Sequence, residues 1–151
     1  MAKKQTPTDE ALKLDNQLCF ALYSASLAMT KLYKPVLSKV GMTYPQYLVM
    51  LALWENDGQT VSELGERLFL DSGTLTPLLK RLESAGWLKR TRARDDERRV
   101  IISLTEAGQQ LKAQASLIPE CMLRATRCAL PEIQSITRQI QALRERLTLR
   151  P

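Results

Sequence analysis

The chain of 151 residues contains no histidine and only three cysteines. Without histidine there is no imidazole general base, no Ser-His or Cys-His nucleophile pair and no ordinary zinc site. Cys19, Cys121 and Cys128 are too few and too scattered for a disulfide framework, and their odd number leaves at least one unpaired. We therefore expect a protein that is not an enzyme and that carries no cofactor or metal.

Long apolar runs and glycine-rich loops are also missing. No stretch reaches the ~18 apolar residues of a membrane span, and the opening residues MAKKQTPTDE lack the apolar core of a signal peptide. The six glycines are isolated, so no phosphate-binding loop is present. The sequence predicts a cytoplasmic protein with no membrane partner.

Positive charge is what the chain has in excess, and it is concentrated. The net charge is +6, and the stretch from Lys80 to Arg99 holds eight Lys or Arg residues against four Asp or Glu. Concentrated basic charge favours an anionic partner such as nucleic acid over a merely solvated surface.

The stretch from Asp71 to Arg99 combines a helix with a basic hairpin. Asp71 is a good N-cap, leucines follow at helical spacing, and Gly86 ends the helix. Two short β-type runs, 87–92 and 99–104, then flank an arginine-rich turn. A helix with a neutral polar face suits the major groove of DNA, and an arginine-tipped hairpin suits the minor groove beside it. The pattern predicts a winged helix-turn-helix.

Three more helices are predicted upstream of this stretch. The first covers residues 9–34, and Thr43 caps a second over residues 44–55. A capping box over residues 60–63 starts a short third helix that ends at Leu68. A short helix, a brief turn and a longer polar-faced helix form a helix-turn-helix.

Two helical segments follow the hairpin. The first opens at Thr105 and is expected to bend at Pro119. The second starts near Leu130 and carries a narrow apolar stripe at steps of three and four residues. Such a stripe packs either on its own domain or on a partner helix. Because the helical ends flank the DNA-binding module, we favour a two-fold homodimer, which presents two recognition helices to successive major grooves.

The predicted fold class is mainly α (α+β), with a winged helix-turn-helix domain and a dimerisation domain built from the N- and C-terminal helices. We expect a disordered tail over residues 1–9 and an N-terminal dimerisation helix region over 10–43. The winged helix-turn-helix DNA-binding domain is expected over 44–104, and the C-terminal dimerisation helices over 105–151.

Several segments resemble the MarR family of winged-helix regulators, namely LTEAGQQL over 104–111 and DERR over 96–99. LDNQLCFALYSASLAMTKLYKPVL over 14–37, TYPQYLVMLALWE over 43–55 and LDSGTLTPLLKRLE over 70–83 are similar to the organic hydroperoxide resistance regulators within it. The resemblance implies a dimeric repressor of operator DNA whose N-terminal cysteine is oxidised by organic hydroperoxides.

The resemblance also implies the residues that contact DNA. Asp96 and Arg98 match a wing motif whose charge pairing shapes the loop. A solvated hairpin is the blander interpretation of the basic turn, but basic residues beside a helix-turn-helix favour DNA. The expected DNA contacts lie on the recognition helix and in the wing: Ser72, Thr74, Thr76, Pro77, Lys80, Arg81, Arg92, Arg94 and Arg98.

Cys19 is the predicted redox sensor. On a helix it lies one turn from Tyr23 and close to the face of Asn16, and the resemblance implies that Tyr33 and Tyr44 also reach it. Hydroxyl donors favour the thiolate, the form that attacks a peroxide, and tyrosine rings give apolar walls that suit an alkyl hydroperoxide. From the residues alone a buried structural cysteine is the commoner role, and the resemblance reverses that preference.

A second cysteine is expected to resolve the oxidised one. Oxidised Cys19 is first a sulfenic acid, which forms a disulfide with another thiol. Cys121 and Cys128 point to the two-cysteine branch of the family, in which the resolving cysteine comes from the other subunit. That branch carries it where this chain has Arg124, with a second cysteine at the position of Cys128. Either cysteine, or neither, is the resolver, and Cys121 is slightly favoured.

Two other functions compete with this hypothesis. A thiol peroxidase also uses a reactive cysteine, but it leaves the winged helix unexplained. A MarR-type repressor relieved by a small aromatic ligand is the nearer rival, with the tyrosines binding a phenolic compound and Cys19 incidental.

Overall fold

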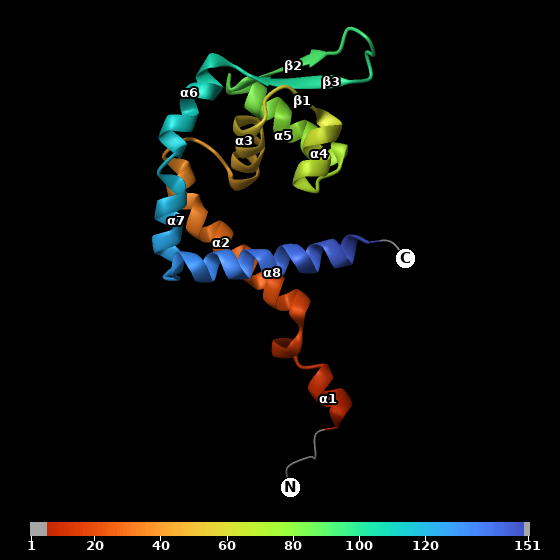
Figure 1. Cartoon of the computed structure of the whole chain (residues 1–151), viewed down its shortest axis with the longest axis vertical. Coiled ribbons are helices and arrows are strands. Elements are labelled where there is room, and N and C mark those ends of the chain that lie inside the picture. The colour runs from red at the N-terminus through yellow and green to blue at the C-terminus, as the bar shows by residue number, and fades with distance from the viewer. Residues whose placement is uncertain (1–5, 150–151) are drawn as a thin grey trace.

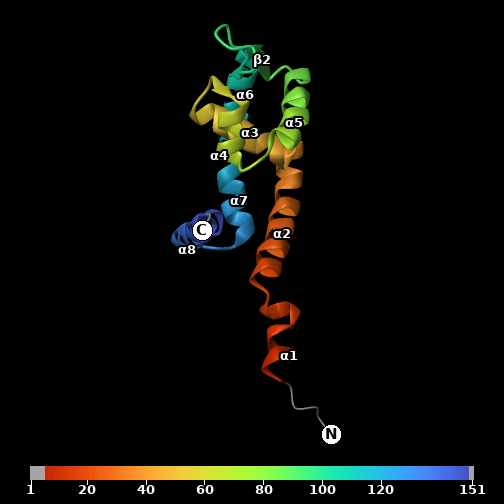
Figure 2. The ribbon, with the colours of Figure 1, turned by 90° about the vertical axis from the view of Figure 1, so that its right-hand side faces the viewer.

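The computed structural model describes residues 6–149, whose helices form an upper lobe under a small sheet and a lower region of long helices (Figure 1). The upper lobe contains α3 (Tyr44–Glu55), α4 (Val61–Leu68) and α5 (Ser72–Ser84). Below it, α2 (Leu18–Ser38) extends towards residues 6–17, which we call the N-terminal arm. This arm projects from the rest of the molecule (Figure 2). The predicted class, mainly α with a small β part, is confirmed.

The sheet has three antiparallel strands in the order β1-β3-β2, formed by β1 (Gln59–Thr60), β2 (Leu88–Arg92) and β3 (Val100–Leu104). In the hairpin, Leu88 lies opposite Leu104 and Arg92 opposite Val100. This confirms the predicted wing. The two-residue strand β1 was not predicted, because it is too short to show a period.

The predicted starts of the three upper helices are confirmed by their caps. The hydroxyls of Thr43 and Thr60 and the carboxylate of Asp71 each accept the main-chain N–H three residues later. Phe69, between α4 and α5, has a left-handed backbone with φ of 57°. The turn is tight at Gly65, where a Cβ would lie 2.8 Å from the carbonyl oxygen of Leu70.

The first predicted helix, 9–34, has the wrong bounds. The chain instead forms α1 (Pro7–Ala11), a 3₁₀ turn η1 (Leu14–Asn16) and then α2. The break is held by side chains, because Asn16 Nδ2 donates to the Glu10 carbonyl (2.7 Å) and Gln17 Nε2 to the Ala11 carbonyl (2.7 Å). Local side-chain hydrogen bonds of this kind compete with the helical ladder.

The last residues of the predicted N-terminal tail are helical. Thr6 caps α1 with a capping box to Asp9, so residues 7–9 begin a helix instead of belonging to a disordered tail. Residues 1–5 of the predicted tail lie outside the described residues.

The helix predicted to bend at Pro119 is two helices, α6 (Glu106–Ala115) and α7 (Ile118–Thr126). Pro119 lies in the first turn of α7, where its missing N–H breaks no intrahelical hydrogen bond. The last helix, α8 (Leu130–Thr148), begins where it was predicted.

Two tryptophans attach α6 to the upper lobe. The indole N–H of Trp54 donates to the Gly108 carbonyl at 2.9 Å, and the N–H of Thr105 donates to the Trp87 carbonyl at 3.1 Å. Around this contact the core is filled by fully buried apolar side chains, including Leu53, Leu64, Leu75, Leu79, Leu82 and Ile102. Helix α5, the predicted recognition helix, therefore packs against a buried core.

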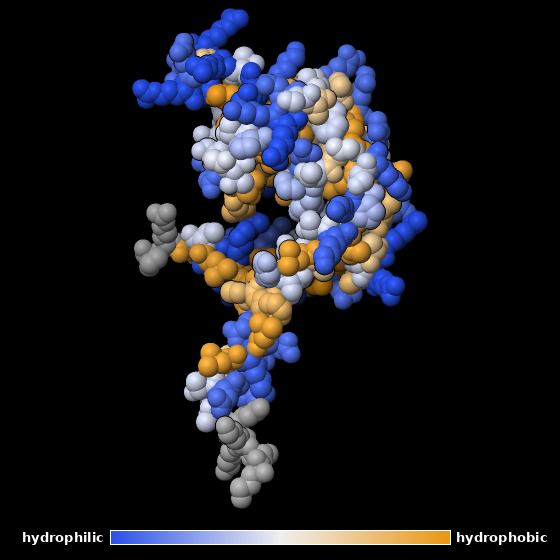
Figure 3. Space-filling model, turned by 180° about the vertical axis from the view of Figure 1, so that it is seen from behind, coloured by the Kyte–Doolittle hydropathy of each residue, from blue (hydrophilic) through white to orange (hydrophobic). Residues whose placement is uncertain are grey.

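The lower helices leave apolar side chains uncovered. Leu37 is the one buried residue of α2, and α8 has none among residues 130–148. Large apolar side chains are exposed along α2 and α8, including Leu18, Leu27, Leu32, Ile136, Ile140 and Leu147. Hydrophobic side chains also gather on the arm and below the upper lobe (Figure 3). Within residues 6–149 no helix is both long and apolar enough to cross a membrane.

Candidate DNA interface and cysteine site

Helix α5 separates its apolar and polar faces as predicted for a recognition helix. Leu75, Leu78, Leu79 and Leu82 are buried, and Thr76 is half-buried. Five of the residues predicted to contact DNA are exposed to solvent: Ser72, Thr74, Pro77, Lys80 and Arg81. The main-chain N–H of Thr74 donates to Asp71 at 2.7 Å and holds the pKa of that carboxyl below its usual value.

The wing carries three exposed arginines that were predicted to contact DNA: Arg92 at the end of β2, and Arg94 and Arg98 in the connecting loop. The expected charge pairing between Asp96 and Arg98 is wrong. Asp96 Oδ1 accepts the main-chain N–H of Arg98 at 3.0 Å, and the ion pair joins Asp95 to Arg99 at 3.2 Å. The Asp96 side chain therefore constrains the loop by binding the main chain of Arg98.

An ion pair that the sequence did not reveal joins the recognition helix to the wing. Arg90 Nε and Nη2 each lie 3.3 Å from Glu83 Oε1, and the Arg90 main-chain N–H donates to Glu83 Oε2 at 2.9 Å. That main-chain donor, followed by the guanidinium, holds the pKa of Glu83 below its usual value. The two residues are seven positions apart across a turn, so no helical or strand period brings them together.

Cys19 is exposed in the first turn of α2, not buried in the core. Tyr23 lies one turn further along the same helix and is 64% exposed. The Asn16 amide donates to the Glu10 carbonyl in the arm. Among the predicted pocket residues, only Tyr23 therefore lies on the helical turn next to Cys19 within one chain.

The other two predicted pocket residues belong to a tyrosine cluster at the far end of α2. The ring of Tyr33 lies 4.7 Å from that of Tyr44 and 5.9 Å from that of Tyr47, measured between centroids. Burial, followed by the neighbouring Tyr44 and Tyr47, raises the pKa of Tyr33 to about 12. Tyr47 was missed, although its spacing of three from Tyr44 in TYPQY signals a shared helix face.

Within one chain, Cys19 and this cluster do not meet. Tyr33 follows Cys19 by fourteen residues on the same helix. At a rise of about 1.5 Å per residue, the two positions are separated by about 21 Å along the helix axis. A pocket that contains Cys19, Tyr33 and Tyr44 therefore requires residues from two subunits.

The two candidate resolving cysteines differ in accessibility. Cys121 is exposed on α7, next to a Glu120–Arg124 ion pair of 2.6 Å. Cys128 is half-buried between α7 and α8, and its Sγ lies 3.4 Å from the Thr126 carbonyl oxygen, to which it donates. In the described part of the chain, no group of three His, Cys, Asp or Glu side chains is placed to hold a metal.

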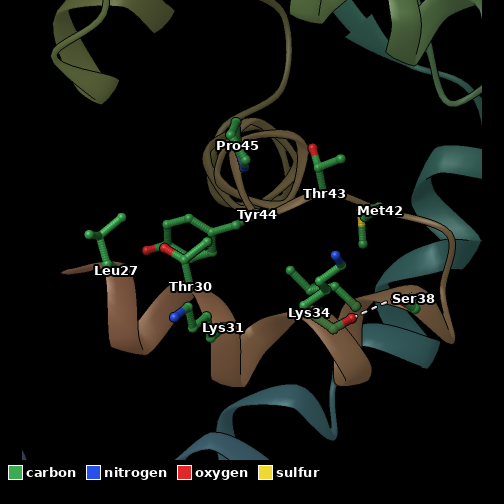
Figure 4. A pocket seen from close by; sticks show the side chains of 10 residues that line it. Leu27, Thr30, Lys31, Lys34, Ser38, Met42, Thr43, Tyr44 and Pro45 are labelled. Carbon is green, nitrogen blue, oxygen red and sulfur yellow. Dashed lines mark hydrogen bonds between the residues drawn. The ribbon is translucent and has the colours of Figure 1, made fainter. Parts of the chain in front are cut away.

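A hollow of about 400 Å³ lies between the second half of α2 and the start of α3 (Figure 4). Leu27, Met42 and Tyr44 supply apolar walls, and Lys31 and Lys34 come from α2. The hollow combines an apolar surface with two cationic side chains.

Comparisons with known proteins agree on the class of protein. The family model described as transcriptional regulator SarA/Rot matches residues 31–115. The organic hydroperoxide resistance transcriptional regulator of Bacillus subtilis is 49% identical over 136 residues, which are 90% of this chain and 92% of that protein.

Solved structures agree as well. Reduced AbfR bound to DNA, a protein of Staphylococcus epidermidis, is 40% identical with a TM-score of 0.73, covering 93% of this chain and 99% of that chain. The disulfide form of AbfR, also 40% identical, matches with a TM-score of 0.60 and covers 93% of each chain.

Proposed function

The chain belongs to the MarR family of winged-helix transcriptional regulators, of the organic hydroperoxide resistance kind, and we propose that it is a dimeric repressor released from operator DNA when an organic hydroperoxide oxidises Cys19. We assign DNA binding to residues 44–104 and dimerisation to residues 10–43 and 105–151. The relatives are regulators by name, and this chain is a regulator and not an enzyme.

The observation that carries the proposal is the position of Cys19. A structural cysteine belongs in the core, whereas this thiol is exposed on a helix face whose neighbours Leu18 and Tyr23 are also uncovered. An apolar surround favours an alkyl hydroperoxide over hydrogen peroxide, because it buries the alkyl group.

A second copy of the chain completes the site. If two α2 helices pack antiparallel about a two-fold axis beside Ser26, Cys19 of one subunit lies opposite Tyr33 of the partner subunit. Small side chains at Ser24, Ala25 and Ser26 allow the two helices to approach closely there. The uncovered apolar side chains of α2 and α8 are then buried, which gives the dimer its driving force.

The chemistry is a two-electron oxidation of sulfur. The Cys19 thiolate attacks the terminal peroxide oxygen, the O–O bond breaks, and the alkoxide leaves and takes up a proton to become an alcohol. Cys19 is then a sulfenic acid. A thiol of the partner subunit attacks this sulfur, the S–S bond forms, and the sulfenic oxygen departs as water. We assign the second thiol to Cys121, because it is the more accessible candidate.

An intersubunit disulfide releases DNA by moving the helices that carry the two DNA-binding domains. Two recognition helices read successive major grooves only when their separation matches one helical turn of DNA. A covalent link at Cys19 shifts α2, which supports the upper lobe. The separation between the two recognition helices then no longer matches one helical turn of DNA.

A mobility-shift assay tests the proposal. The duplex is one that the reduced protein itself selects from a random library, and the oxidant is cumene hydroperoxide. We expect the oxidant to release wild-type protein, dithiothreitol to restore binding, and Cys19→Ser to bind DNA normally but resist release. Release of Cys19→Ser by the hydroperoxide would remove the sensor assignment.

The hollow beside Lys31 and Lys34 supports a second candidate function, a repressor relieved by a small aromatic anion. In that case a ligand releases Cys19→Ser as readily as wild type, and dithiothreitol has no effect on the release. Thiol reversal therefore separates the two functions.

A further inference from the structure

A cleft of about 440 Å³ lies where the start of α4, the recognition helix and the wing meet. The elements that line it, α4, α5 and the wing, belong to the upper lobe, whereas α8 and the start of α2, which carries Cys19, lie below that lobe (Figure 1). Its polar lining comes from β1, α4, α5 and the wing and consists of Thr60, Ser62, Ser72, Thr76, Arg90, Arg98 and Arg99.

The cleft lining carries a net positive charge. It contains three guanidinium groups and no carboxylate. Arg90 is bound by Glu83 and Arg99 by Asp95, but Arg98 forms no ion pair with any described residue. One positive charge is therefore uncompensated, and the cleft also presents hydroxyl groups that donate hydrogen bonds.

Arg90 is held in place more firmly than the wing arginines. Its side chain is 29% exposed, and Glu83 binds both its guanidinium and its main-chain N–H. The contacts to Glu83 use Nε and Nη2, so the donors of Nη1 stay available. A guanidinium fixed in this way loses little conformational entropy when it binds an anion.

The position of the cleft identifies the anion. When a recognition helix enters the major groove and a wing enters the adjacent minor groove, the sugar-phosphate strand that separates the grooves must pass between them. The cleft lies between α5 and the wing, on that path. A phosphodiester bears one negative charge and two acceptor oxygens, which match arginine and hydroxyl donors.

We propose that this cleft seats one backbone phosphate in each half-site, with Arg90, Arg98 and the hydroxyl of Ser62 as its donors. The inference rests on the proposed DNA binding, and it adds Arg90 and Ser62 to the contacts expected from the sequence. The contact is independent of base sequence.

The test compares two variants of the cleft with a matched control, all kept reduced. Arg90→Gln and Ser62→Ala alter the cleft, and Ser62→Ala keeps the Arg90–Glu83 pair. Arg67→Gln removes an arginine that is also ion-paired, to Glu55 at 3.1 Å, on the opposite end of α4. Affinity is measured at several salt concentrations for the self-selected duplex and for a scrambled duplex of equal length.

For Arg90→Gln we expect a loss of about tenfold on both duplexes and a salt slope smaller by about 1, because a phosphate contact is lost. Ser62→Ala should weaken both duplexes by a smaller factor without changing the slope, and Arg67→Gln should match wild type. A loss confined to the selected duplex would mean that Arg90 reads a base, and unchanged affinity in both cleft variants would also overturn the proposal.

A methylphosphonate scan localises the contact. Neutralising one phosphate at a time should weaken wild type most at one position per half-site, and that position should no longer matter to Arg90→Gln. Sensitivity of Arg90→Gln to the same position as wild type would contradict the assignment. If wild type binds no duplex at all, the DNA-binding function itself fails, a result distinct from failure of the cleft.

Discussion

The guanidinium carbon of Arg144 lies 4.2 Å from the centroid of the Phe69 ring. Arg144 belongs to α8, and Phe69 forms the left-handed turn that leads into the recognition helix. The contact connects the C-terminal helix, which we assign to dimerisation, with the turn of the helix-turn-helix. The contact therefore couples the position of α8 to the turn that precedes the recognition helix.

A double-mutant cycle measures this contact. Arg144→Gln and Phe69→Leu should each lower the free energy of unfolding, with a coupling of about 0.5–1 kcal/mol, the usual value for an exposed cation–π pair. Urea denaturation supplies the four values. Arg146→Gln, on the same helix but without a described ring contact, should show no coupling to Phe69→Leu. Additive effects of Arg144→Gln and Phe69→Leu would contradict the contact.

The resolving cysteine can be identified on non-reducing gels. After treatment with cumene hydroperoxide, Cys121→Ser should yield no disulfide-linked dimer, because the accessible thiol is missing. Cys128→Ser should yield as much linked dimer as wild type, because its thiol is half-buried between two helices. The reverse pattern would assign the role to Cys128, and linked dimer in both variants would show that neither cysteine is required by itself.

The tyrosine cluster predicts how stability depends on alkaline pH. The pKa of Tyr33 is raised from 10.0 to about 12, so the unfolded chain ionises at lower pH than the folded one. The resulting stability is fully present below pH 10 and is lost as the pH rises towards 12. Urea unfolding across this range should show a steeper decline for wild type than for Tyr33→Phe. Equal slopes would show that burial does not suppress this ionisation.

Gly108 is required by a close main-chain approach. A Cβ at this position would lie 2.0 Å from the Trp87 carbonyl oxygen, a backbone atom that cannot move away without disturbing the wing. Gly108→Ala should lower the free energy of unfolding by about 1–3 kcal/mol or more, as overpacking does. Gly73→Ala, where the nearest atom is the end of the Asp71 side chain at 3.3 Å, should be nearly neutral or stabilising. Thermal melting of the two variants gives the comparison.

Local signals explain why much of the upper lobe was predictable. Thr43, Thr60 and Asp71 cap their helices through residues three positions away, so the sequence contains both partners of each contact. The leucine spacing of α5 and the β-type runs of the wing are equally local. Predictions were less accurate where side chains such as Asn16 bind carbonyls six residues back and interrupt a helical pattern.

The candidate site was also predictable in part, in its residue types but not in its contacts. The sequence by itself determined the residue types: a polar recognition helix, an arginine-rich wing, a cysteine on an amphipathic helix and a tyrosine-rich segment. Only the tertiary structure decided which of these meet. Glu83 and Arg90 come together across a turn, and Cys19 and Tyr33 are held apart by their positions along one continuous helix. The reason is physical, because periodicity reports which face of an element is apolar, whereas distances between elements depend on how all of them pack at once.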